Sequence, residues 1–93
     1  MADFKITPPV PFIVEGANGD IYELPRVKDL SAEQFAALGE FNKADGTAER
    51  MTACRDFVLT LCPDLANEPI TDMWCMQLMN ELGKDSGLAE GES

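Results

Sequence analysis

Residues 12–24 read FIVEGANGDIYEL, in which two short runs of β-forming residues flank an Asn-Gly pair, a strong turn signal. A two-residue turn at this pair would place Val14 opposite Glu23 and mix apolar and charged side chains on each face. A three-residue loop with a left-handed Gly19 instead places Val14 opposite Tyr22. We favour this bulged loop, because burial of one face decides the register of a hairpin. It gathers four apolar side chains on one face: Phe12, Val14, Tyr22 and Leu24.

The apolar spacing changes from a period of two to the helical period after the hairpin, which predicts an α+β fold. We expect residues 1–82 to form a single domain in which an N-terminal β-hairpin packs on a small three-helix domain. Its parts are an extended arm over 1–11, the hairpin over 12–24 and a helical part over 31–82. Residues 83–93 contain one large apolar residue and are expected to be a disordered acidic tail.

Local chemistry predicts where the helices begin and end. Ser31 and Gln34 have the spacing of a capping box, in which each side chain bonds the other's backbone. Pro63 should end the second helix, because the residue before a proline is pushed out of the helical region. Thr71 is expected to cap the third helix and Gly83 to close it. The three helices are expected over about residues 31–43, 47–61 and 72–82.

Apolar residues recur on one side of each expected helix, and these sides should meet in the core. Replacement of a central member by alanine should be costly, because it would leave a cavity. Six residues of these stripes are expected to be mostly buried: Phe35, Leu38, Phe57, Leu61, Trp74 and Leu78.

The chain of 93 residues has 7 Lys and Arg against 17 Asp and Glu and no His, so its formal charge is −10. This acidity argues against nucleic-acid binding, which needs a basic patch for the phosphates. The lack of His removes the usual general base near pH 7 and the commonest metal ligand. Neither a phosphate-binding loop nor a calcium loop is present. We therefore expect no enzyme activity, no cofactor and no metal.

Cysteine use and the N-terminal residues bear on the compartment. An odd number of cysteines without a C-x-x-C pair predicts free thiols that pack as small apolar residues. A three-thiolate metal site is disfavoured, because no His could complete it. The sequence has neither a secretory signal pattern nor an apolar run near the roughly 20 residues of a membrane span. We expect a cytoplasmic protein, in the host cell if a phage encodes it. The three cysteines are Cys54, Cys62 and Cys75.

Two apolar features are candidate protein-binding surfaces. At 100° per residue, Met73 and Met76 fall on the polar side of the third helix, and methionines on such a side are typical of adaptable contact surfaces. The alternative is that they are ordinary scattered surface residues. The hairpin edge around Ile13 and Ile21 is the second candidate, because an exposed strand edge can recruit another chain.

Four stretches also carry a family resemblance over about residues 10–82. The arrangement of a short hairpin, a Leu-Ser helix start, a helix ending in Leu-Cys-Pro-Asp-Leu and a Trp-containing helix resembles the tail assembly chaperones of long-tailed bacteriophages and related prophages. The resemblance implies a non-enzymatic protein that binds the tape-measure protein, keeps its hydrophobic helices soluble and aids tail-tube assembly. It also implies a longer frameshifted product. The expected partner is therefore a tape-measure or tail-tube protein, and formation of homo-oligomers is left open. The stretches are Phe12-Ile13-Val14, Tyr22-Glu23-Leu24-Pro25, Leu30-Ser31 and Leu61-Cys62-Pro63-Asp64-Leu65.

Two other functions remain as alternatives. A small acidic protein can act as a charge decoy that binds and inhibits a nucleic-acid-binding host protein. That function needs carboxylates on one continuous face, whereas here Lys43, Arg50 and Arg55 interrupt them. A small adaptor with no connection to phages is the third possibility. The genes beside this one would separate the three.

Overall fold

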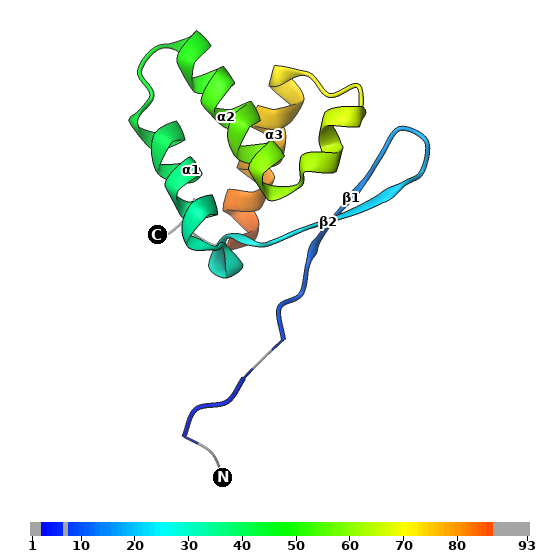
Figure 1. The fold of residues 1–93 in the computed structure, drawn as a ribbon, viewed down its shortest axis with the longest axis vertical. Helices are drawn as coiled ribbons and strands as arrows, with labels where there is room; N and C mark the ends of the chain where they lie inside the picture. Colours follow the sequence, from blue (N-terminus) through cyan, green and yellow to red (C-terminus); the bar gives the residue numbers. More distant parts are fainter. Residues whose placement is uncertain (1–2, 7, 87–93) are drawn as a thin grey trace.

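The computed structural model describes residues 3–6 and 8–86, and it confirms the α+β fold (Figure 1). A two-stranded antiparallel hairpin is followed by three helices, of which α2 packs against both α1 and α3. Short 3₁₀ turns connect the hairpin to α1 and α2 to α3. The elements are β1 (Phe12–Glu15), β2 (Ile21–Leu24), η1 (Val27–Asp29), α1 (Ala32–Lys43), α2 (Thr47–Leu61), η2 (Pro63–Asn67) and α3 (Asp72–Ser86).

The hairpin has the register of the bulged loop. Val14 lies opposite Tyr22. Gly16 N–H donates to the Asp20 carbonyl at 2.7 Å, and Gly19, with φ of 91°, donates back to the Gly16 carbonyl at 3.1 Å. Val14 is buried on the inner face, whereas alternate residues on the outer face are exposed. The two-residue turn is therefore wrong, and burial of one face decides the register as expected.

The helix starts follow the expected caps, but one helix end does not. Ser31 and Gln34 form the capping box, and the Trp74 N–H donates to the Thr71 hydroxyl at 3.0 Å. Helix α3, however, continues through Gly83 to Ser86, so its expected end at Leu82 is wrong. Among the described glycines only Gly19 and Gly46 have positive φ, so Gly83 does not adopt the left-handed cap conformation. An interior glycine costs a helix only about 1 kcal/mol.

The expected tail thus begins as helix over its first four residues, and the rest of it lies outside the described residues. An ion pair between Lys84 and Glu81, with 3.6 Å between Nζ and Oε2, spans the glycine. Within the described part of the chain, no helix has the length and apolar character needed to cross a membrane.

The core forms around α2, whose buried residues face both neighbouring helices. Phe57 and Leu61 are buried as expected, as is Leu78 of α3, while Leu38 and Trp74 are half-buried. Phe35 is 49 % exposed, so its expected burial is wrong. The full set of buried apolar residues is Val14, Leu24, Phe41, Cys54, Phe57, Val58, Leu61, Leu65, Cys75, Leu78 and Leu82.

Phe35 is exposed because the buried side of α1 is centred on another residue. That centre is Phe41, which is buried and covered by the Arg50 guanidinium of α2 at 4.3 Å from the ring centroid. Phe35 lies about 120° around the helix from Phe41 at 100° per residue. It therefore lies at the side of α1 rather than under it.

The three cysteines are free, with Cys54 and Cys75 buried and Cys62 half-buried. Burial raises the pKa of the Cys54 thiol to about 11. It raises the pKa of Cys75 for the same reason. Both side chains therefore stay protonated near neutral pH and act as small apolar core residues, since the thiolate is the reactive form.

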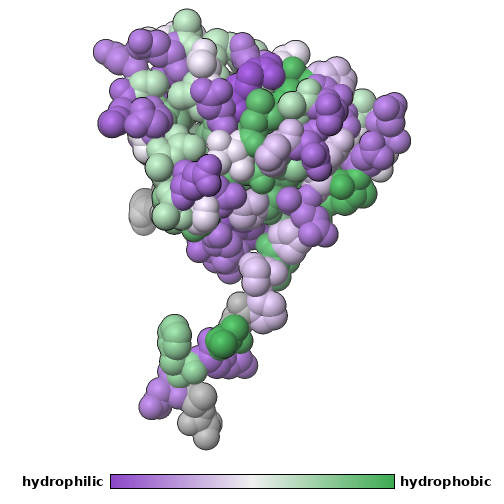
Figure 2. All heavy atoms as spheres, viewed as in Figure 1, coloured by the Kyte–Doolittle hydropathy of each residue, from purple (hydrophilic) through white to green (hydrophobic). Residues whose placement is uncertain are grey.

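The N-terminal arm projects from the start of β1, away from the helices (Figure 1). Its base is held by Arg26, whose Nε donates to the Val10 carbonyl at 2.8 Å and whose terminal nitrogen donates to the Pro11 carbonyl at 3.3 Å. The radius of gyration is 14.4 Å, against about 12 Å for a compact chain of this length. Apolar residues of the arm lie apart from the body in Figure 2, and Phe4 and Ile6 are each 93 % exposed.

Candidate binding groove beside strand β1

The hairpin tip is fastened to the connection between η2 and α3 through one carboxylate. Glu68 accepts hydrogen bonds from the Tyr22 hydroxyl at 2.6 Å and from the Ala17 N–H at 3.0 Å. Gly16 permits this approach, because a Cβ at that position would collide with the Glu68 carboxylate and lie 3.0 Å from the Tyr22 ring. The tip of the hairpin is therefore held at a defined distance from the start of α3.

The Tyr22–Glu68 hydrogen bond moves the two pKa values apart. It favours the neutral phenol and the charged carboxylate, so it raises the pKa of Tyr22 to about 12 and lowers that of Glu68. The Ala17 N–H lowers the pKa of Glu68 further. Because the pKa of Tyr22 is raised by folding, its contribution to stability is present below the ordinary value of 10 and is lost as the pH rises through about 12.

Tyr22 is the only tyrosine, so its ionisation can be followed by ultraviolet absorbance. We expect a midpoint near pH 12 in the wild type and a midpoint closer to 10 in Glu68→Gln, which removes the charged acceptor. The check is a spectrophotometric titration, with circular dichroism at each pH to verify folding. Equal midpoints in the two proteins would contradict the hydrogen bond.

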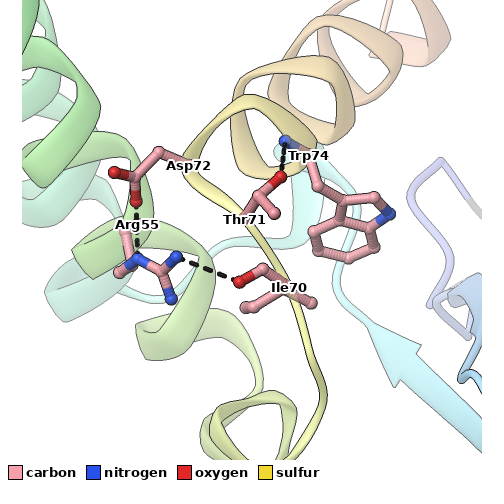
Figure 3. Close-up of polar contacts among 5 residues, drawn as sticks. All are labelled: Arg55, Ile70, Thr71, Asp72 and Trp74. Carbon is pink, nitrogen blue, oxygen red and sulfur yellow. Dashed lines mark hydrogen bonds and ion pairs between the residues drawn. The ribbon is translucent and has the colours of Figure 1, made fainter.

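The start of α3 is tied to α2 by Arg55 (Figure 3). Its Nε donates to Asp72 Oδ1 at 2.7 Å, and a terminal nitrogen donates to the Ile70 carbonyl at 3.1 Å. The hydrogen bond to Asp72 raises the pKa of Arg55 further. Figure 3 shows the Trp74 ring on the other side of the helix start from this ion pair. Arg55 and the Thr71 cap together orient the turn that carries Trp74.

A groove runs between β1 and α3, with Trp74 at its centre. Two adjoining hollows make it up, of about 380 and 330 Å³, and both are lined by Val14, Glu15 and Trp74. The first continues past the hairpin tip to Glu68 and Ile70. The second continues along α3, where its further lining residues are Phe12, Ile13, Gln77, Leu78 and Glu81. The floor is apolar and the rim carries carboxylates.

Within the part of the chain that the structure describes, the edge of β1 beside this groove has no partner strand. In an antiparallel pair, every second residue of a strand forms hydrogen bonds to the partner strand. Gly16 bonds to Asp20, so on β1 the next residue that bonds to β2 is Val14. The N–H and C=O groups of Ile13 and Glu15 therefore point to the free edge. Among the described residues, none forms a hydrogen bond with these outward groups. Such an edge can accept a further extended segment.

The structure separates the four residues that the sequence indicated as a binding surface. Ile13 is exposed and lines the groove, whereas Ile21 is exposed on β2 and lines neither hollow. Met73 is 60 % exposed and lines neither hollow; it lies one turn before Gln77, which lines the groove from α3.

Met76 does not belong to that exposed surface. Its side chain is half-buried and packs against the core, so its expected place beside Met73 on the outer face is wrong. The most buried residue of α3 is Cys75, and Met76 lies only about 100° from it around the helix. The buried side of α3 is wide enough to include it.

Sequence reasoning missed two residues that define the groove. Trp74 was expected in the core but forms the centre of the groove, as a half-buried aromatic residue at the edge of the buried side. Glu68 had no assigned role, and its contacts join residues 46 and 51 positions apart. The sequence places Glu68 in the connector before the Thr71 cap, and this position alone does not predict which residues it contacts.

A wider hollow of about 780 Å³ lies between α1 and α2. Its lining includes four carboxylates but also Lys43, which pairs with Glu40 at 3.3 Å. These carboxylates are not placed to share an ion: within residues 3–6 and 8–86, no group of three or more His, Cys, Asp or Glu side chains could hold a metal ion. The other residues that line it are mainly alanines, which offer little to recognise a ligand. The four carboxylates are Glu40, Asp45, Glu49 and Asp56.

The sequence was compared with protein-family models and with curated proteins, and the structure with solved structures; none of these comparisons finds a match.

Proposed function

We propose that this protein is a non-enzymatic tail assembly chaperone-like protein that binds the tape-measure protein and aids tail-tube assembly. The observation that carries the proposal is the groove beside β1, which has an apolar floor, a rim of carboxylates and an unpaired strand edge along one side. The proposal assigns the groove to apolar segments of the client before the client assembles.

The chemistry of the groove suits a hydrophobic client. Trp74 and Leu78 supply apolar surface, and the edge of β1 supplies backbone groups that bond any extended segment regardless of its side chains. A chaperone of this kind has to accept many segments of one client, so backbone recognition is an advantage. The adjoining Met73 adds a deformable apolar contact.

The acidic surface supplies the second property that a chaperone needs. With a charge of −10, copies of the complex repel one another while the apolar client segment is covered. Glu15 and Glu81 on the rim keep this charge close to the bound segment.

The proposal is tested with a matched pair of variants. Ile13 and Ile21 are both exposed, and each lies opposite a glutamate, Glu23 and Glu15 respectively, so a lysine at either position gains a cross-strand charge partner. Only Ile13 lines the groove. We expect Ile13→Lys to weaken binding of the tape-measure protein more than tenfold, about 1.4 kcal/mol. Ile21→Lys should bind as the wild type does.

The measurement is a pull-down of the tape-measure protein from co-expressing cells, with its soluble fraction measured in parallel. Met73→Glu changes the exposed methionine alone, because Met76 packs against the core. We expect Met73→Glu to reduce binding while leaving folding intact. If the wild type leaves the tape-measure protein as insoluble as it is alone, the chaperone function is refuted. If Ile13→Lys and Ile21→Lys bind equally, the groove is not the client site.

The charge decoy is less well supported. Its best surface is the hollow between α1 and α2, where Lys43 lies among the four carboxylates and pairs with one of them. Selective capture of a nucleic-acid-binding host protein in the same pull-down, without the tape-measure protein, would favour the decoy instead.

A further inference from the structure

The N-terminal arm presents apolar side chains that nothing in the described part of the same chain covers. Phe4 and Ile6 are each 93 % exposed, and Val10 is also exposed. Phe4 and Ile6 are two positions apart, so in an extended segment they lie on one face, about 6.7 Å from each other. Two large apolar side chains at this spacing have the pattern of a strand with one face to bury.

The groove beside β1 has a matching arrangement. Its two hollows lie on either side of Trp74 and share the same stretch of β1, so they follow one another along the strand. The free edge offers the N–H and C=O groups of Ile13 and Glu15. A segment paired with that edge would place alternate side chains over the groove.

The arm cannot readily fill the groove of its own chain. The groove begins at Phe12 and extends toward the hairpin tip, whereas the arm runs from the start of β1 in the opposite direction (Figure 1). A reversal would have to occur within a stretch that contains Pro8, Pro9 and Pro11, where each proline fixes its own φ at about −65° and the residue before each proline is pushed to an extended conformation. Arg26 also holds the carbonyls at the base of the arm.

We propose that the groove of one copy holds the Phe4–Ile6 segment of a second copy, so that the protein self-associates by arm exchange. Phe4 and Ile6 occupy the two hollows on either side of Trp74, and the arm backbone pairs with the free edge of β1. The exchange is favoured by the prolines, because they keep the arm extended and directed away from its own domain.

Charge complementarity also favours the arm as the occupant. Residues 3–10 carry one Asp and one Lys and are neutral, in a chain whose charge is −10. In an extended segment Lys5 points to the opposite face from Phe4 and Ile6. This is the face of β1 that carries Ile13 and Glu15, so Lys5 brings a cation toward the Glu15 carboxylate. An acidic segment would be repelled by the same carboxylate.

The test measures self-association of the full chain without any client. Sedimentation velocity over about 5–500 µM should show wild-type dimers that dissociate on dilution. Phe4→Asp/Ile6→Asp should weaken association more than tenfold without affecting folding, because both side chains are exposed. Ile21→Ser is the control, since it removes an exposed isoleucine that lies outside the groove without placing a carboxylate opposite Glu15, and it should associate as the wild type does.

A second readout locates the arm in the groove. Trp74 is the only tryptophan, so its emission should shift to longer wavelength as the wild type is diluted and the arm leaves. The Phe4→Asp/Ile6→Asp variant should show no such shift. A wild type that is monomeric at about 500 µM, association that survives in the arm variant, or emission that does not change on dissociation would each overturn the inference. These measurements use no client, so their failure leaves the proposed chaperone function standing, and failure to bind the client leaves arm exchange standing.

Discussion

Replacement of Phe57 by alanine should lower the free energy of unfolding by about 3–5 kcal/mol. Phe57 is 1 % exposed and lies on α2, which packs against both of the other helices. Its removal leaves a cavity that neither neighbouring helix can close without moving away from the other. Chemical denaturation followed by circular dichroism measures the loss.

Phe35→Ala is the control for this prediction, because it removes the same side chain from a position that is 49 % exposed. We expect it to cost about 1 kcal/mol or less, since half of the ring is already in water. A loss under about half a kcal/mol for Phe57→Ala, or equal losses for the two variants, would show that α2 is not the centre of the core.

The second large effect is expected at the end of the hairpin. Leu24 is 1 % exposed although it belongs to a strand of only four residues. Leu24→Ala should cost about 2–5 kcal/mol, because the hairpin is held to the helices through this side chain and Val14. The same denaturation experiment measures it.

Ile21→Ala on the same strand is the matched control, and its exposed side chain should make the change nearly neutral. A small loss for Leu24→Ala would mean that the hairpin is attached mainly by the Glu68 hydrogen bonds. In that case Glu68→Gln would be the more destabilising of the two variants, whereas we expect Leu24→Ala to be.

Local and periodic signals predicted most of the fold. The hairpin register could be predicted because only one register places all four apolar side chains on one face. The Ser31 and Thr71 caps could be predicted because each depends on residues three positions apart. The end of α3 could not, because the effect of Gly83 depends on the helical residues that follow it.

The groove was harder to predict than the fold. Ile13 was predicted together with Ile21 because a hairpin leaves a strand edge exposed, and Met73 was predicted because it falls on the polar side of its helix. All three side chains are exposed, but only Ile13 lines the groove. The wrong predictions for Phe35 and Met76 have one cause. The apolar spacing of a single helix gives the direction of its buried side, but the width of that side depends on how the neighbouring helices pack against it. The role of Glu68 depends on tertiary contacts with residues far away in the chain.

The long separation of the Glu68 contacts has a consequence for the order of folding. The helices of each neighbouring pair are joined by short connections, so their contacts close small loops, whereas the hydrogen bonds from Ala17 and Tyr22 to Glu68 close loops of 51 and 46 residues. Larger loops cost more entropy to close and form later. We therefore expect the helices to assemble first and the hairpin to dock on them last. We expect local unfolding of the native protein to follow the reverse order, in which the hairpin detaches while the helices remain packed. One wall of the groove is thus expected to open at a lower free energy than the helices on which it packs.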